Sequence, residues 1–209
     1  MTQNKNNTKI LVTCAMMVAL GGILSVFPTF KGLWPNGGSI TLCSMLPVII
    51  VSYLYGLKWG FMSSAVFAVI QIMSDLRGIA GTDAMTTFWV IFLDYGLAFI
   101  VLGLGGIFKG KFNDPAKELA LGSIVAIGLR FLCHFTSGYL LFSDYAEWFF
   151  TQEGFAFGNS VYASLQNSKL LFVAYSVIYN ASYLLPEIIM TAIAAYIIGK
   201  SGILKKAAL

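Results

Sequence analysis

The sequence predicts an all-α, polytopic membrane protein, and three observations lead to that fold class. Of the 209 residues, 58% are hydrophobic and only 11% are charged, which is more apolar surface than a soluble domain of this size can keep from water. Several apolar runs approach or exceed the ~20 residues that a membrane helix needs. The alternation of polar and apolar residues typical of membrane barrels does not occur, so the spans are expected to be helices.

Six transmembrane helices are expected in a single domain that covers residues 1–209. They run over 9–29, 39–56, 59–74, 85–108, 119–142 and 171–198. The polar start Met1–Lys9 precedes a run too long for a signal peptide, so the first span is expected to be a retained anchor. The second and third spans are short, and only residues 56–60 separate them. A tight hairpin is expected there, or a partly inserted helix in place of one of the two spans.

The basic residues indicate the orientation of these helices. With the N-terminus inside, nine of the 13 Lys and Arg residues fall in inside segments, three fall in outside loops, and Arg130 lies within a span. The inside set is Lys5, Lys9, Lys58, Lys109, Lys111, Lys117, Lys200, Lys205 and Lys206, and the outside set is Lys31, Arg77 and Lys169. This asymmetry predicts cytoplasmic termini and a multi-pass protein of the cell membrane.

The longest connection, residues 143–169, lies outside in this topology and is rich in aromatic residues. It contains Trp148, Phe149, Phe150, Phe155 and Phe157, which is too aromatic for a disordered linker. A short interfacial helix or a lid over an outward-facing pocket fits this composition. An aromatic belt at the level of the lipid headgroups is the alternative.

Few strongly polar side chains remain inside the spans: Asp94, Arg130, His134, Asn180 and Glu187. An ionised Asp at the centre of a membrane helix costs about 2.5–3.5 kcal/mol, so Asp94 is expected to have a partner or a task. Arg130 and His134 share one helical face at i, i+4. These groups would line one cavity near the outer leaflet if the last three helices face one another. The alternative is an Asp94–Arg130 ion pair that only ties two helices together.

Aromatic residues complete the candidate binding site. They are Trp89, Tyr95, Tyr139, Phe142 and Tyr175, whose rings suit stacking on a flat ligand or covering a cation. Asp94 would neutralise a cation, while His134 and Asn180 offer hydrogen-bond donors and acceptors. The set indicates a small, polar and cationic molecule. For Glu187, which follows Pro186, a helix contact is favoured over a ligand role.

Several function classes are disfavoured. The chain has a single His, which excludes a multi-His metal site, and it has no phosphate-binding glycine loop. Cys14, Cys43 and Cys133 show no metal-binding or disulfide spacing. The basic residues gather in the inside loops, so no nucleic-acid partner is expected. We therefore expect no metal, no cofactor and no enzymatic activity, and ATP-driven transport would require another subunit.

The first span carries a stripe of small residues. Ala15 and Ala19 stand four apart, and Gly21 and Gly22 extend the stripe. Such a stripe lets another helix approach closely in lipid. It predicts either internal packing or a docking face for a partner protein.

These features together resemble the thiamine-specific substrate-binding (S) components of energy-coupling factor (ECF) transporters, the ThiT family. The resemblance spans all six helices. It rests on Ala15-x-x-x-Ala19, on Gly56-Leu57-Lys58-Trp59-Gly60, on Phe92-Leu93-Asp94-Tyr95, on Arg130-Phe131-Leu132-Cys133-His134-Phe135 and on Ala174-Tyr175-Ser176-Val177-Ile178-Tyr179-Asn180.

The resemblance implies a protein of the bacterial cytoplasmic membrane that captures thiamine from outside. It would dock through its first helix onto a transmembrane coupling subunit driven by two ATPase subunits. Asp94, His134, Tyr175 and Asn180 would contact the vitamin, with Tyr95 and Phe142 among the aromatic walls.

The sequence departs from the family pattern at three positions. The family acid is typically Glu where this chain has Asp94, the family Trp before the second helix is replaced by Gly38 with Trp34 nearby, and Phe142 stands in place of a Trp. A thiamine precursor or another small vitamin therefore stays open as the ligand. A stand-alone transporter in which Asp94 and His134 relay protons is the other alternative.

Overall fold

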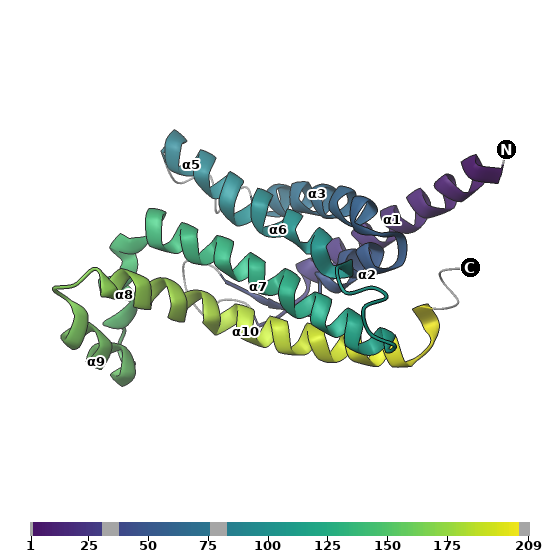
Figure 1. Cartoon of the computed structure of the whole chain (residues 1–209). Helices are drawn as coiled ribbons and strands as arrows, with labels where there is room; N and C mark the ends of the chain where they lie inside the picture. The colour runs from purple at the N-terminus through teal and green to yellow at the C-terminus, as the bar shows by residue number, and fades with distance from the viewer. Residues whose placement is uncertain (1, 31–37, 76–82, 205–209) are drawn as a thin grey trace.

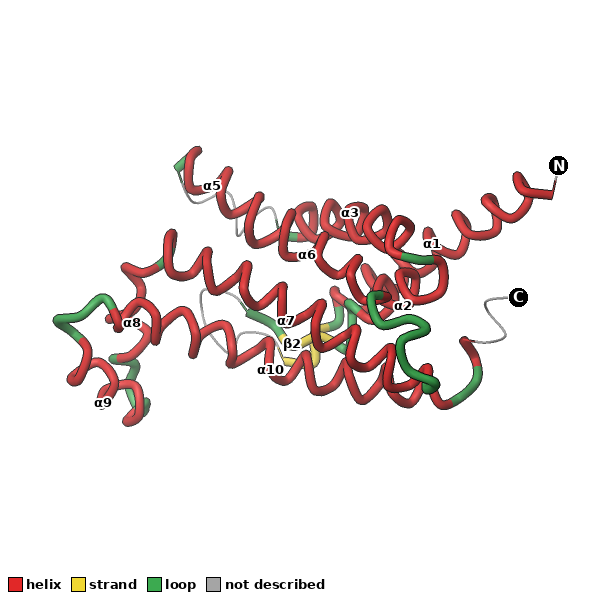
Figure 2. Tube along the Cα trace, in the orientation of Figure 1, coloured by secondary structure: helices red, strands yellow, loops and turns green. Residues whose placement is uncertain are grey.

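The computed structural model is almost entirely helical and describes residues 2–30, 38–75 and 83–204 (Figure 1). Helix α1 (Thr2–Val26) leads into a short antiparallel pair of strands, β1 (Pro28–Phe30) and β2 (Ile40–Thr41). Figure 2 shows this pair beside the long helices. Trp34, Lys31, Arg77, Lys205 and Lys206 lie outside the described residues.

Helix α2 (Leu46–Tyr55) is shorter than the predicted second span. The expectation of a helix from residue 39 is wrong, because residues 40–41 form β2 and the helix begins only at Leu46. Every residue from Leu46 to Leu54 is buried, so α2 lies in the middle of the bundle rather than against lipid. Ten residues rise only about 15 Å, too little to cross a bilayer. An evenly apolar helix of this kind is typical of a core position.

A single residue, Gly56, joins α2 to α3 (Leu57–Ser74), which confirms the predicted tight hairpin. Gly56 has a φ of 91°, a backbone conformation that favours glycine. Its N–H donates to the Ser52 carbonyl at 3.0 Å, and its own carbonyl accepts from the Gly60 N–H at 3.0 Å. The turn therefore ends one helix and begins the next without a loop.

The predicted fourth span is one continuous helical rod made of four pieces. It consists of α5 (Ala84–Val90), the π-helical η1 (Ile91–Leu97), α6 (Ala98–Ile100) and the 3-10 helix η2 (Val101–Gly106). Asp83 caps its start, since the Asp83 carboxylate accepts from the backbone of Met85 and Thr86. The pKa of this exposed carboxyl is lowered by a hydrogen bond from the Thr86 side chain and by those from the backbone. The π-helical stretch places Asp94 at its centre.

Helices α7 (Pro115–Leu141) and α10 (Leu170–Lys200) form the long central pair (Figure 1). Their close approach requires glycine near both ends. A Cβ at Gly138 would stand 2.5 Å from the Ser176 hydroxyl, and one at Gly199 would stand 2.3 Å from Ala116. Helix α10 continues through Pro186 to Lys200. Lys200 donates to Asp114 at 3.0 Å, which joins the end of α10 to the N-cap of α7 and lowers the pKa of Asp114.

The segment between α7 and α10 folds into the 3-10 helix η3 (Ser143–Tyr145) and two short helices, α8 (Ala146–Phe150) and α9 (Ala156–Leu165). Phe149 and Phe150 are fully buried and pack with Leu171 and Tyr175 of α10. The expectation of short helical structure here is confirmed. Whether the segment acts as a lid stays a prediction.

Five of the described helical segments are long and apolar enough to cross a membrane, and α2 is the shorter sixth apolar helix. The start of α1 and the end of α10 lie at the same end of the bundle, opposite α8 and α9 (Figure 1). That arrangement agrees with an even number of passes. The assignment of that end to the cytoplasm rests on the basic residues alone and stays a prediction.

Candidate functional site

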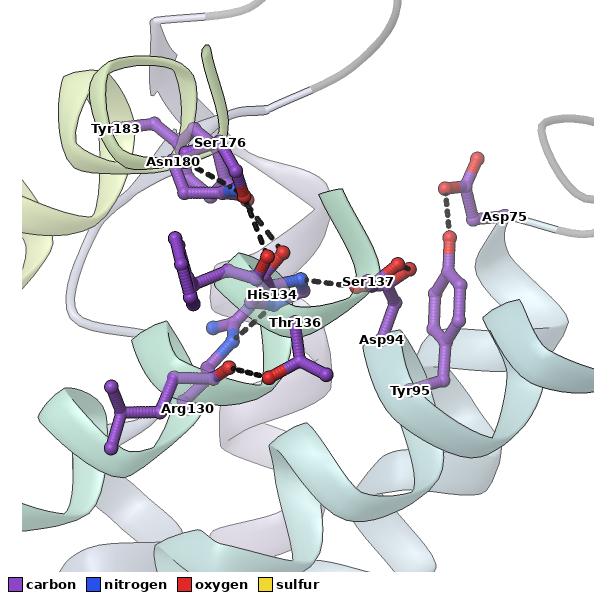
Figure 3. A network of polar contacts seen from close by, with 12 residues as sticks. Asp75, Asp94, Tyr95, Arg130, His134, Thr136, Ser137, Ser176, Asn180 and Tyr183 are labelled. Atoms are coloured by element: carbon purple, nitrogen blue, oxygen red, sulfur yellow. Dashed lines mark hydrogen bonds and ion pairs between the residues drawn. The ribbon is translucent and has the colours of Figure 1, made fainter. Parts of the chain in front are cut away.

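Asp94 is held from two sides by helix α7. Its Oδ1 lies 2.8 Å from Nδ1 of His134, and its Oδ2 accepts a hydrogen bond from the Ser137 hydroxyl (Figure 3). His134 and Ser137 are one turn apart on α7, so both point toward the same side of η1. The side chains of His134 and Asp94 are 12% and 15% exposed, so both are largely buried. The carboxylate is thereby fixed with both oxygens in use.

The hydrogen bonds also determine the tautomer of His134. Arg130 donates through Nε to Nε2 of the imidazole at 3.2 Å, so Nε2 must carry a lone pair. The ring proton then lies on Nδ1 and is donated to Asp94. A neutral His134 therefore stands between a cation and an anion. In the described residues, Arg130 forms no ion pair with Asp94, because the imidazole separates them.

Arg130 has weak partners for a cation within a membrane span. Its guanidinium lies 4.2 Å from the centre of the Phe99 ring, and Nη1 donates to the Met45 sulfur at 2.8 Å. A cation over an aromatic face gains up to about 2 kcal/mol when desolvated. These contacts connect the site to α6 and to the start of α2.

Helix α10 supports the site from the opposite side. The Asn180 amide donates to the His134 carbonyl at 3.2 Å and to the Ser176 carbonyl at 2.8 Å. Its oxygen accepts from the Tyr183 hydroxyl at 2.6 Å, and the Tyr183 ring meets the His134 ring edge-on at 6.2 Å. Ser176 donates to the Phe135 carbonyl at 2.6 Å. The polar groups of α7 and α10 thus form one connected network (Figure 3).

Aromatic rings continue from this network toward α8. Tyr175 and Tyr179 are one turn apart with ring centres at 5.6 Å. Phe149 of α8 meets both rings edge-on at 5.5 and 5.7 Å. Tyr175, a predicted ligand, is therefore 4% exposed and embedded in an aromatic cluster beside Asn180.

Four predicted residues lie at the margins of the network. Tyr95 donates its hydroxyl to Asp75 at the end of α3 and so points away from Asp94 (Figure 3). Trp89 is 40% exposed and packs against Phe88 and Phe92 on an outer face of the rod. Tyr139 stacks on its neighbour on α7, Phe135, at 6.4 Å, and Phe142 lies 6.3 Å from Tyr145.

Ser137, Ser176 and Tyr183 belong to the network but are not among the predicted ligand residues. The spacing of Ser137, three residues after His134, was a usable signal, because i, i+3 neighbours on a helix share a face. Tyr183 likewise follows Asn180 by three residues. No group of three or more His, Cys, Asp or Glu side chains able to hold a metal occurs among the residues that the structure covers.

The comparisons with known proteins agree with this architecture. A family model described as thiamine transporter protein (Thia_YuaJ) matches residues 11–161. The thiamine transporter ThiT of Bacillus subtilis (strain 168) is 27% identical over 202 residues, which cover 92% of this chain and 91% of that protein. A solved structure of ThiT from Listeria monocytogenes superimposes with a TM-score of 0.69 at 17% identity, covering 98% of this chain and 99% of the other.

At 17% identity the structural likeness establishes the fold, while the family model covers 151 residues, well over half of the chain. The membrane-length helices and the polar network between η1, α7 and α10 lie on that fold. This chain is an integral membrane protein that belongs to the thiamine transporter protein (Thia_YuaJ) family.

Proposed function

We propose that this protein binds thiamine at the network around Asp94 and serves as the substrate-binding component of an ECF transporter in the cytoplasmic membrane. One observation carries the binding part: a carboxylate within the membrane, held by His134 and Ser137, next to the aromatic cluster of α10. Thiamine has a permanently charged thiazolium and a flat aminopyrimidine. An acid beside aromatic rings can hold the charged thiazolium, and Asn180 and His134 can form hydrogen bonds with the aminopyrimidine.

The coupling part of the proposal draws on the surface of α1. Ala15 and Ala19 are both exposed and so do not pack against the chain's own helices, whereas Gly21, at the end of the stripe, is buried against Ser44 and Phe67. Beside it, an apolar cavity of about 310 Å³ lies between α1, α2 and the end of α10, lined by residues such as Met17, Pro47 and Ile198. Close helix approach in lipid relies on such surfaces. A helix of a transmembrane coupling subunit, itself driven by ATPase subunits, is the proposed partner.

A role in binding and transport is favoured over catalysis. Asp94 and His134 hold each other, and Ser137 donates to the carboxylate rather than to the imidazole. The hydroxyl is therefore not paired with the imidazole, as it would be in a Ser–His nucleophile pair.

Titration of the purified protein with thiamine tests the binding proposal. We expect quenching of intrinsic tryptophan fluorescence with a sub-micromolar midpoint, because Trp148 packs against the aromatic cluster that contains Tyr175. Hydroxymethylpyrimidine, the free pyrimidine half of thiamine, serves as the comparison ligand. No response to thiamine at high micromolar concentration would refute the proposal, and tighter binding of the pyrimidine would assign the site to a precursor.

Uptake by proteoliposomes separates the two transport mechanisms. Vesicles that contain this chain alone are expected to show no thiamine accumulation under an imposed proton gradient. Accumulation that follows the gradient would favour the proton-coupled carrier in which Asp94 and His134 relay protons.

A further inference from the structure

A second acid lies within the membrane region close to the network and is not used by it. Glu187 follows Asn180 by two turns on the same buried side of α10 and is 2% exposed. Its Oε1 accepts from the backbone N–H of Thr41 at 2.5 Å and also from the Thr41 hydroxyl. Its Oε2 is buried and has no hydrogen-bond partner in the described residues. An unpaired oxygen of this kind is costly unless a charge nearby compensates for it.

Arg130 is the positively charged residue that interacts with both Glu187 and Asp94. The guanidinium interacts electrostatically with both acids, yet no carboxylate oxygen lies within ion-pair distance of it among the described residues. Its direct contacts are an imidazole nitrogen, a sulfur and an aromatic face. At low dielectric, charges interact strongly over such separations even without contact.

A count of charges then gives a net value for the cluster. With His134 neutral and both acids ionised, Asp94 and Glu187 contribute two negative charges and Arg130 one positive charge, which leaves one negative charge. A ligand with a single positive charge would neutralise the cluster. Without Glu187 the cluster would already be neutral, and the same ligand would leave a positive charge buried in the membrane.

We propose that Glu187 is ionised and is a specificity-determining residue that balances Arg130 and so leaves the charge of Asp94 available for a cationic ligand. This inference rests on the proposed binding of thiamine at Asp94. Glu187 acts through Arg130 rather than by touching the ligand. Glu187 is therefore expected to make the binding affinity depend on the charge of the ligand and not on its shape.

The test compares thiamine with its uncharged isostere, in which a thiophene ring replaces the thiazolium. In Glu187→Gln, we expect the affinity for thiamine to fall about tenfold, because one unit of charge is lost near the site. The affinity for the isostere should stay within about twofold, because the amide keeps the shape and can still accept from Thr41. Glu118→Gln is the matched control, since Glu118 is equally buried but bonds to Tyr53 and Phe112 at the other end of α7.

A purely structural role for Glu187 predicts a different pattern. If Glu187 only anchors β2, its replacement would weaken both ligands equally, as would Thr41→Val, which removes the hydroxyl that donates to Glu187. Equal loss for the two ligands in Glu187→Gln, or no loss for either, would overturn the inference but would not contradict the proposal that the unaltered protein binds thiamine. Absence of thiamine binding by the unaltered protein would instead refute the proposed function, and the inference with it.

Discussion

Asp94 shows how a carboxylate within a membrane span is stabilised by hydrogen bonds from a neighbouring helix. The carboxylate does not contact Arg130 directly. His134 lies between them, accepts a hydrogen bond from Arg130 and donates one to Asp94. Ser137 supplies the second donor. Hydrogen bonds to the charged form stabilise an ionised carboxylate, so this arrangement offsets part of the cost of burying it. The position of the charge is thus set by α7 rather than by η1 alone.

The first prediction concerns this carboxylate. Asp94→Asn should weaken thiamine binding at least tenfold, about 1.4 kcal/mol, because it removes the counter-charge and places an amide N–H₂ group against one of the two donors, His134 or Ser137. Calorimetric titration measures the change. Ser137→Ala is the companion variant: it keeps the charge and is expected to lose less affinity. An unchanged affinity in Asp94→Asn would reduce Asp94 to a helix-pairing residue.

At the scale of elements, the π-helical stretch and the glycines of α7 decide which faces meet. A π-helix turns less per residue than an α-helix, so a helical wheel drawn with 3.6 residues per turn misplaces side chains along Ile91–Leu97. Along this stretch Tyr95 faces the end of α3, where its hydroxyl donates to Asp75. On the other side, Gly122 lets α7 lie directly against η2, where its Cβ position is 2.0 Å from the Gly105 carbonyl.

The second prediction tests that contact. Gly122→Ala should destabilise the protein by about 1–3 kcal/mol, because the methyl group has no space and must push α7 away from η2. Thermal unfolding in detergent measures the loss. Gly128→Ala on the same helix is the control, since nothing lies within 4 Å of its Cβ position, and the better helix propensity of Ala should leave the melting temperature equal or higher. Equal effects at both positions would contradict close packing at Gly122.

At the scale of the whole molecule, the site and the proposed docking face are separate. The Asp94 network involves η1, α7 and α10, whereas Ala15 and Ala19 lie on the exposed side of α1, which packs on α2 and α3. Binding and transport should therefore respond to different substitutions.

The third prediction uses that separation. Ala15→Phe and Ala19→Phe should abolish thiamine uptake in cells while leaving the affinity of the purified protein unchanged, because bulky rings prevent close helix approach. Leu132→Phe, at a 54% exposed position on α7, is the control and should support uptake. Loss of both binding and uptake in the α1 variants would point to a role of the stripe in folding.

The sequence by itself determined the class of the protein and the inventory of its polar groups. Composition and apolar runs are local properties, and a charged side chain in an apolar run is visible wherever the helix faces. For this reason the helical bundle, the hairpin at Gly56 and the short helices of residues 143–169 were predictable, and Asp94, His134 and Asn180 could be singled out.

The tertiary structure decided which of these groups meet. The burial of α2, the π-helical turn at Asp94 and the entry of His134 between Asp94 and Arg130 all depend on how helices distant in sequence pack. The same packing turned Trp89 toward an outer face and placed Glu187 against Thr41. Hydrogen bonds between helices require contact geometry, which the periodicity of a single helix does not contain.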